Sequence, residues 1–182
     1  GCTYVLNKTS GQIYEQMSQM AQLYAQELDN RFLRISRNLF SAIMDTNETN
    51  STFWGNVNLM KNGDYSEYAI GKLREEYFSS AWEYGTEYRI FLYTHDTDKL
   101  YQLSLSSDGN YTMSSDVAAS IREQIDKLDE KTYAVKRKWD VLECDDEVYI
   151  CKIAQKNGIA LGCIVNVKSI LEPFSKLSLG KH

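Results

Sequence analysis

Proline is nearly absent from this chain: its 182 residues contain one, Pro173, close to the C-terminal end. Neither proline nor glycine occurs between Ile13 and Ile43, so no helix-breaking residue interrupts that stretch. Apolar side chains recur there at every third or fourth position, which is the period of a helix packed along one side. They are Ile13, Met17, Met20, Tyr24, Leu28, Phe32, Ile35, Leu39 and Ile43. The pattern predicts one uninterrupted helix from Ser10 to Met44.

This helix would be about 50 Å long, whereas helices of globular proteins typically run ~8–20 residues. Thr9 and Gln12 form a capping-box pattern, which predicts the start of the helix. The apolar stripe is narrow up to Leu28 and wider from Phe32 onward. We therefore expect the first half to contact a single partner and the second half to pack on a sheet.

Long apolar runs and an excess of basic residues are also missing. No stretch of about 18 apolar residues predicts a membrane span, and no basic-then-apolar leader opens the sequence. A membrane span or leader in a segment trimmed from either end would not appear in this sequence. The net charge of −5 argues against nucleic-acid binding, which needs a basic face to offset phosphate repulsion.

Histidine is scarce, since the chain has only His95 and His182. A Ser–His or Cys–His arrangement would depend on His95, and no nucleophile elbow, phosphate-binding loop or zinc-protease motif occurs. The segment 95–98 (His-Asp-Thr-Asp) is typical of a hairpin turn and less so of a metal loop. We therefore predict no enzyme activity, cofactor or metal; a hydrolase with paired carboxylates is the alternative left open.

The four cysteines lack the close spacing of a zinc site. Cys151 and Cys163 flank a turn and could face each other across a hairpin; buried free thiols are the favoured interpretation and a disulfide stays open, as it does for Cys144. Gly1-Cys2 also matches a lipidated bacterial N-terminus. Glycosylation sequons begin at Asn7, Asn47, Asn50 and Asn110. Either the chain is a glycosylated ectodomain, or the sequons arise by chance because the chain is rich in Asn, Ser and Thr.

The remaining patterns predict a mixed domain. Asp45–Gly63 is polar, with Phe53 and Trp54 as its only large anchors, and is predicted to be a loop. Further helices are expected from Asp64 to near Gly85, from Ser114 or Ser115 to Leu128, and from Lys168 to Leu177 with Pro173 in the first turn. Strands are expected at Tyr88–Thr94, Leu100–Ser106, Lys138–Glu143, Val148–Gln155 and Ile159–Val167, with a tight turn at Asn157-Gly158.

Neither face of these strands is simply polar. In Tyr88–Thr94, Phe91 and Tyr93 point one way while Ile90 and Leu92 point the other, so both faces of the sheet should be covered. We predict an α+β fold with a five-stranded antiparallel sheet. The long helix would pack on one face, and shorter helices and loops on the other.

Several segments together carry a resemblance to a known family. They are Tyr65-Ser66-Glu67-Tyr68, Tyr88-Arg89-Ile90-Phe91-Leu92-Tyr93, Lys138-Trp139-Asp140-Val141-Leu142-Glu143, and Tyr149-Ile150-Cys151-Lys152 leading to Ala160-Leu161-Gly162-Cys163-Ile164-Val165. Behind a long N-terminal helix, these elements resemble the Cache branch of the PAS-like fold. More particularly, most of the chain resembles the extracytoplasmic sensor of Gram-positive transmembrane histidine kinases and related receptors.

The resemblance implies a sensor at the extracellular face of the cell membrane, tethered to that membrane in the full-length protein. It would bind a small solute or a solute-binding protein and pass the signal through a long helix (1–45) that also pairs two copies. The sensor domain would span 46–176 and would be the membrane-distal module of a double-Cache ectodomain. Residues 177–182 resemble the linker to the next module or to a membrane helix. The alternative is an extracellular ligand-binding or adhesion lipoprotein without a kinase.

Candidate ligand contacts are polar-tipped or cationic residues in or beside central strands, where an apolar sheet would use valine or isoleucine. We expect the ligand on the sheet face opposite the long helix. The alternative is that the aromatic residues pack in the core and the cations reach solvent past the sheet edge. No ligand class follows from the sequence. The candidates are Arg89, Tyr93, Tyr101, Trp139, Tyr149 and Lys152.

Overall fold

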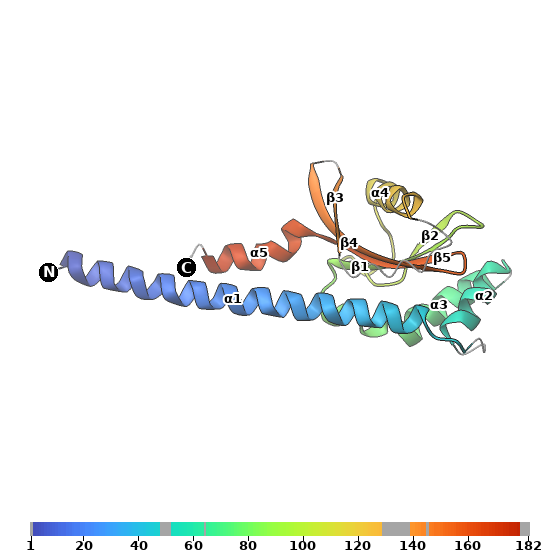
Figure 1. Cartoon of the computed structure of the whole chain (residues 1–182), viewed down its shortest axis with the longest axis horizontal. Helices are drawn as coiled ribbons and strands as arrows, with labels where there is room; N and C mark the ends of the chain where they lie inside the picture. The colour runs from blue at the N-terminus through green and yellow to red at the C-terminus, as the bar shows by residue number, and fades with distance from the viewer. Residues whose placement is uncertain (1, 48–51, 64, 129–138, 145, 179–182) are drawn as a thin grey trace.

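The computed structural model describes residues 2–47, 52–63, 65–128, 139–144 and 146–178. Helix α1 (Cys2–Ile43) contains 42 residues and runs along most of the molecule's length (Figure 1), so the long helix is confirmed. Its predicted start is wrong: α1 continues through Thr9, because nothing between Cys2 and Thr9 breaks a helix. Some sequence-based features lie outside the described residues: Gly1, Asn50, Asp64, Lys138 and positions 179–182.

Five antiparallel strands form one sheet in the order β2-β1-β5-β4-β3, which confirms the predicted sheet. The last strand of the chain is therefore central, between β1 and β4. Strand β1 has the predicted bounds, and the others differ from prediction by a few residues. The strands are β1 (Tyr88–Thr94), β2 (Lys99–Gln102), β3 (Asp140–Cys144), β4 (Glu147–Lys156) and β5 (Ile159–Asn166).

Strand β2 ends at Gln102 and not at Ser106 as predicted. Leu103 still donates its backbone N–H to the carbonyl of Ile90 at 2.7 Å. One residue later, the hydroxyl of Ser104 accepts the Ile90 N–H at 2.8 Å. The side chain thus replaces the carbonyl that a longer strand would have supplied, which is how serine competes with a ladder.

The predicted loop Asp45–Gly63 is wrong, because residues Phe53–Lys61 form helix α2. Thr52 caps it: its hydroxyl accepts the backbone N–H of Gly55 at 3.1 Å. The segment was predicted to be a loop because it contains several asparagines, although its apolar residues have helical spacing. One of these asparagines, Asn56, is buried and donates its side-chain amide to the Thr52 carbonyl at 2.8 Å. The buried apolar residues of α2 are Phe53, Trp54, Val57 and Met60.

The helix predicted to end near Gly85 consists of two segments. Helix α3 (Ser66–Tyr77) is followed by the 3₁₀ helix η1 (Ser79–Tyr84). The break falls at Phe78, whose φ of −127° lies outside the helical region and whose side chain is buried. Gly85, with a φ of +112°, then turns the chain into β1.

The long helix covers one face of the sheet, as predicted, but most of the shorter helices lie on that face too. Helices α1, α2 and α3 lie on one side of the sheet (Figure 1), and together with η1 they share one apolar core with it. Among the described helices, only α4 (Ser115–Asp126) covers the other face, and Ser114 caps it as expected. The α1-face core includes Ile35, Leu39, Phe53, Leu73, Ile90, Leu161 and Val165; the α4-face core includes Phe91, Ile121, Ile125, Ile153 and Ile164.

The turn at Asn157-Gly158 decides the state of the cysteines. Both turn residues have positive φ, which gives a tight hairpin and fixes the register of β4 against β5. In this register Cys151 pairs with Ile164, so Cys151 and Cys163 point to opposite faces of the sheet. A disulfide between them is therefore excluded, and Cys144, Cys151 and Cys163 are free thiols.

Helix α5 (Val167–Ser178) follows β5 directly and lies beside the N-terminal part of α1 (Figure 1). The hydroxyl of Tyr24 donates to the carbonyl of Ile170 and joins the two helices. The expectation that Pro173 falls in the first turn is wrong, because α5 begins at Val167 and places Pro173 in its interior. Within the described ranges, no helix is long and apolar enough to cross a membrane.

Candidate ligand site

A hollow of about 440 Å³ lies on the α4 face of the sheet, where β1 begins and β5 ends. Three strands, the start of α4 and the loop before it contribute to its wall. Polar and charged side chains are prominent among the lining residues, in contrast to the apolar core beside it. The lining residues include Arg89, Asp108, Ser114, Tyr149, Ile164 and Asn166.

The strand register brings the hollow's sheet residues together. Arg89 of β1 lies opposite Ile164 of β5, and Tyr149 of β4 lies opposite Asn166 of β5. Since side chains two residues apart share a face, all four point to the α4 side. Residues far apart in sequence thus meet at one end of the sheet.

Arg89 is a cation that lines this hollow. Its side chain is half-buried, and its guanidinium makes no hydrogen bond or ion pair with any residue that the structure describes. An arginine offers five N–H donors in a planar fork that matches a carboxylate or phosphate. The hydroxyl of Tyr149 likewise has no hydrogen-bond partner within the described ranges.

Three other polar side chains of the hollow are already held in place. The carboxylate of Asp108 accepts from the backbone N–H and the side-chain amide of Asn110, at 3.3 and 3.0 Å. Ser114 accepts the Val117 N–H at 3.3 Å as the cap of α4. Asn166 accepts the Lys168 N–H at 2.8 Å, at the start of α5. These contacts fix the wall, and the charge of Arg89 makes it the group best suited to recruit an anion.

Of the six candidates from the sequence, Arg89, Tyr93 and Tyr149 lie on the α4 face, and two of them line the hollow. Tyr93 is further along β1 and donates its hydroxyl to Asp98 at 2.6 Å. Burial, and then the hydrogen bond to Asp98, raise the pKa of Tyr93 to about 12. Tyr93 is therefore part of the α4-face core and the β1–β2 hairpin.

Tyr101, Trp139 and Lys152 lie on the opposite, α1 face. The indole N–H of Trp139 donates to Ser36 of α1 at 3.1 Å, so this residue joins β3 to the long helix. Lys152 is 5% exposed, and burial lowers its pKa; it does not reach solvent past the sheet edge. The structure thus divides the six candidates between two faces.

Asp108, Ser114 and Asn166 were not among the sequence candidates. The sequence showed them only as residues of a turn, a helix cap and a strand end, which are their ordinary structural roles. Their common location depends on the connection from β2 to α4 folding back over β1 and β5. No local signal in the sequence announces that contact.

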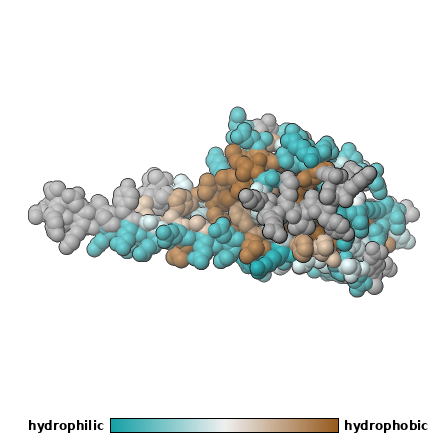
Figure 2. All heavy atoms as spheres, viewed as in Figure 1, coloured by the Kyte–Doolittle hydropathy of each residue, from teal (hydrophilic) through white to brown (hydrophobic). Residues whose placement is uncertain are grey.

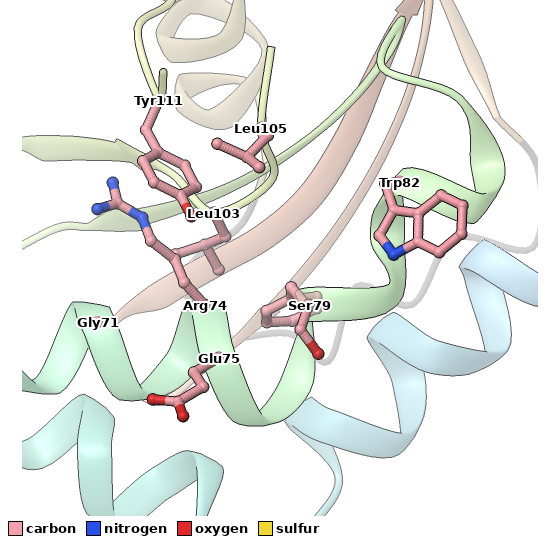
Figure 3. Close-up of a pocket in the computed structure, with 9 residues that line it drawn as sticks. Gly71, Arg74, Glu75, Ser79, Trp82, Leu103, Leu105 and Tyr111 are labelled. Atoms are coloured by element: carbon pink, nitrogen blue, oxygen red, sulfur yellow. The ribbon is translucent and has the colours of Figure 1, made fainter. Parts of the chain in front are cut away.

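A second hollow, of about 380 Å³, lies between α3, η1 and the segment after β2 (Figure 3). Its cation is Arg74, whose Nε and Nη2 both donate to the carbonyl of Gln102, at 3.1 and 2.8 Å. The guanidinium also lies 3.8 Å from the ring centroid of Tyr111. Arg74 therefore holds α3 against this segment, while Trp82 at the rim is 67% exposed.

Comparison with known proteins gives no relative: the chain matches no family model, no curated protein and no solved structure. Function must therefore be argued from the hollows and surfaces themselves. In the part of the chain that the structure describes, no three His, Cys, Asp or Glu residues are grouped so that they could hold a metal ion.

Proposed function

We propose that this chain is the extracellular sensor domain of a membrane-tethered signal-transduction receptor of the histidine-kinase type, with a PAS-like Cache fold. It binds a small solute carrying a carboxylate in the hollow on the α4 face. The observation that carries the proposal is the half-buried guanidinium of Arg89, which has no partner among the described residues and lies in a hollow on the sheet face opposite α1. The five-stranded antiparallel sheet and the long N-terminal helix are compatible with that fold.

The chemistry of the wall favours a small carboxylate over other solutes. The Arg89 guanidinium forms charge-assisted hydrogen bonds to a carboxylate, which are stronger than bonds between neutral groups. The Tyr149 hydroxyl is available for a further bond, and Ile164 supplies an apolar floor. The Asp108 carboxylate on the wall disfavours a second negative charge there.

Strand β5 connects the hollow to the long helix. Ile164 lies on the α4 face, whereas its neighbours Cys163 and Val165 pack in the core shared with α1. A ligand that moves β5 therefore acts on the core that β5 shares with α1. The coupling needs only an affinity that differs between two packings, which is typically worth about 1–3 kcal/mol. Helix α1 begins and α5 ends on the same side of the molecule, where a membrane connection would lie (Figure 1).

A binding screen with matched variants tests the proposal. Small amino acids, hydroxy acids and dicarboxylates are compared with their neutral amides by thermal shift, because a bound ligand raises the melting temperature. Binders are then titrated by calorimetry. For Arg89→Gln we expect about 10- to 100-fold weaker binding, since the substitution removes a charged hydrogen-bonding partner.

Arg122→Gln is the control, because Arg122 lies on the same side of the sheet but pairs with Asp98. This variant should bind as the unchanged chain does. Equal losses for both variants, an unchanged Arg89→Gln variant, or no binding of any carboxylate would each contradict a carboxylate site at Arg89.

A further inference from the structure

The second hollow, between α3, η1 and the segment after β2, gathers large exposed side chains around it. Trp82, Leu105 and Tyr111 all line it and are 67, 42 and 37% exposed. Along α1, by contrast, exposed hydrophobic residues are isolated between hydrophilic ones (Figure 2), which is normal for a protein surface. Several such side chains around one hollow are more typical of a binding site.

The hollow has two aromatic sides and an apolar floor. Figure 3 shows Trp82 on one side, and Arg74 with Tyr111 on the other. Phe78 and Leu103 are buried and supply the floor. The volume of about 380 Å³ lies within the range of small-molecule sites, ~300–1,000 Å³. The hollow therefore has the size and shape to hold a flat ring.

Gly71 keeps the hollow open on the α3 side. A glycine inside a helix lowers stability relative to alanine. Nothing lies within 4 Å of a Cβ placed at Gly71, so no close packing among the described residues requires a glycine there. Because Gly71 lines the hollow, a larger side chain at this position would occupy the space in which a ligand would lie.

The charges in the wall favour a neutral ligand. Arg74 already donates to the carbonyl of Gln102 and lies against the ring of Tyr111. The carboxylate of Glu75, the next residue, makes no hydrogen bond or ion pair with any residue that the structure describes. A cationic ligand would meet the charge of Arg74, and an anionic ligand would meet that of Glu75. A neutral molecule avoids both repulsions.

The polar groups around the floor identify the kind of neutral ligand. The Glu75 carboxylate can accept hydrogen bonds, the Trp82 indole N–H can donate one, and the Ser79 hydroxyl can do both. Within the described ranges, none of these three groups has a hydrogen-bond partner. A pyranose ring matches this wall, because it has an apolar C–H face that stacks on an aromatic ring and hydroxyls around its edge.

We propose that this hollow is a carbohydrate site in which one pyranose ring stacks on Trp82. Glu75 and Ser79 then bind the hydroxyls at the edge of the ring. The site is separate from the hollow on the α4 face, since the two share no lining residue. The inference goes beyond the proposed carboxylate sensor and does not depend on it.

Calorimetric titration of the whole chain tests the proposal. The probes are glucose, galactose, mannose, xylose, N-acetylglucosamine, maltose and cellobiose, and sorbitol is the control because it has hydroxyls but no ring. Trp82→Ala should weaken binding of the best sugar about tenfold or more, since it removes the stacking ring, and Trp82→Phe should weaken it less. Tyr65→Ala is the matched variant: Tyr65 is 61% exposed but does not line the hollow, so sugar binding should be unchanged.

Gly71→Leu separates the site from the fold. Leucine favours a helix more than glycine does, and its Cβ meets nothing within 4 Å, so the melting temperature should not fall. The leucine side chain would fill part of the hollow, so sugar binding should weaken about tenfold or more. A Gly71→Leu variant that binds the sugar as tightly as the unchanged chain would contradict the proposal.

Other outcomes of the titration are equally decisive. Sorbitol binding as tightly as the sugars, equal losses for Trp82→Ala and Tyr65→Ala, or no sugar with a Kd below about 10 mM would each overturn a carbohydrate site. Tighter binding of a disaccharide than of its monosaccharide would support the end of a glycan chain as the ligand, and equal binding a free sugar. Arg89→Gln should leave sugar binding unchanged and Trp82→Ala should leave carboxylate binding unchanged, so failure of either site is distinguishable from failure of the other.

Discussion

Replacing Gly162 with alanine is expected to lower the free energy of unfolding by about 3 kcal/mol, near the upper end for overpacked sites. Gly162 lies in the central strand β5, opposite Phe91 of β1 and Ile153 of β4. A Cβ at this position would lie 2.5 Å from Cζ of Phe91 and closer still to the backbone oxygen of Lys152. The ring could turn, but the carbonyl belongs to the β4 backbone and moves only if the strands separate.

Thermal unfolding followed by circular dichroism measures the effect. For a chain of this size about 3 kcal/mol corresponds to a melting temperature lower by roughly 6–12 °C. Gly71→Ala is the matched control: it lies in α3, and nothing approaches its added Cβ within 4 Å. That variant should gain about 0.5–1 kcal/mol, because alanine favours a helix more than glycine does. Equal melting temperatures for the two variants would contradict the close approach at β5.

Replacing Phe53 with alanine is expected to cost about 3–5 kcal/mol, the range for truncating a buried aromatic residue. Phe53 is fully buried at the first turn of α2 and meets the rings of Trp54 and Tyr77, at 5.4 and 5.9 Å. Its loss would leave a cavity where α1, α2 and α3 meet. The neighbouring Trp54 indole, which donates to the Ile43 carbonyl at 2.9 Å, would lose the ring that packs beside it.

Urea unfolding gives the free energy directly, and Trp82→Ala is the control. Trp82 is also a large aromatic residue, but it is largely exposed. The free energy of unfolding of Trp82→Ala should therefore stay within about 0.5 kcal/mol of that of the unchanged chain. If Phe53→Ala were as stable as Trp82→Ala, segment 53–61 could not be a helix packed in the core.

Local patterns were sufficient for the regular elements of this fold. The helical period from Ile13 to Ile43 predicted α1, and the alternation in Tyr88–Thr94 predicted β1 with both its faces. Ser114 as a helix cap and Asn157-Gly158 as a turn also followed from short signals. Helix α2 was missed, because its asparagines resembled a loop and its apolar face appears only when Phe53 and Trp54 are buried together.

The candidate site was predicted only in part. Arg89 and Tyr149 could be chosen because a cation and a polar-tipped aromatic are unusual in strands buried on both faces. The same rule also selected Lys152 and Trp139, which pack toward α1. The residue type showed that these positions are unusual for a buried strand, but it did not show which face of the sheet each side chain would lie on.

The sequence alone determined that one helix would extend far along a five-stranded antiparallel sheet, because hydrophobic period and turn chemistry are local properties. The tertiary structure alone decided which strands became neighbours, which faces Cys151 and Cys163 took, and that Arg89 has no partner in the part of the chain that the structure describes. These outcomes depend on the β4–β5 register and on how the segments between strands fold back over the sheet. Contacts of that kind join residues far apart in the chain, and no short window of sequence contains both partners.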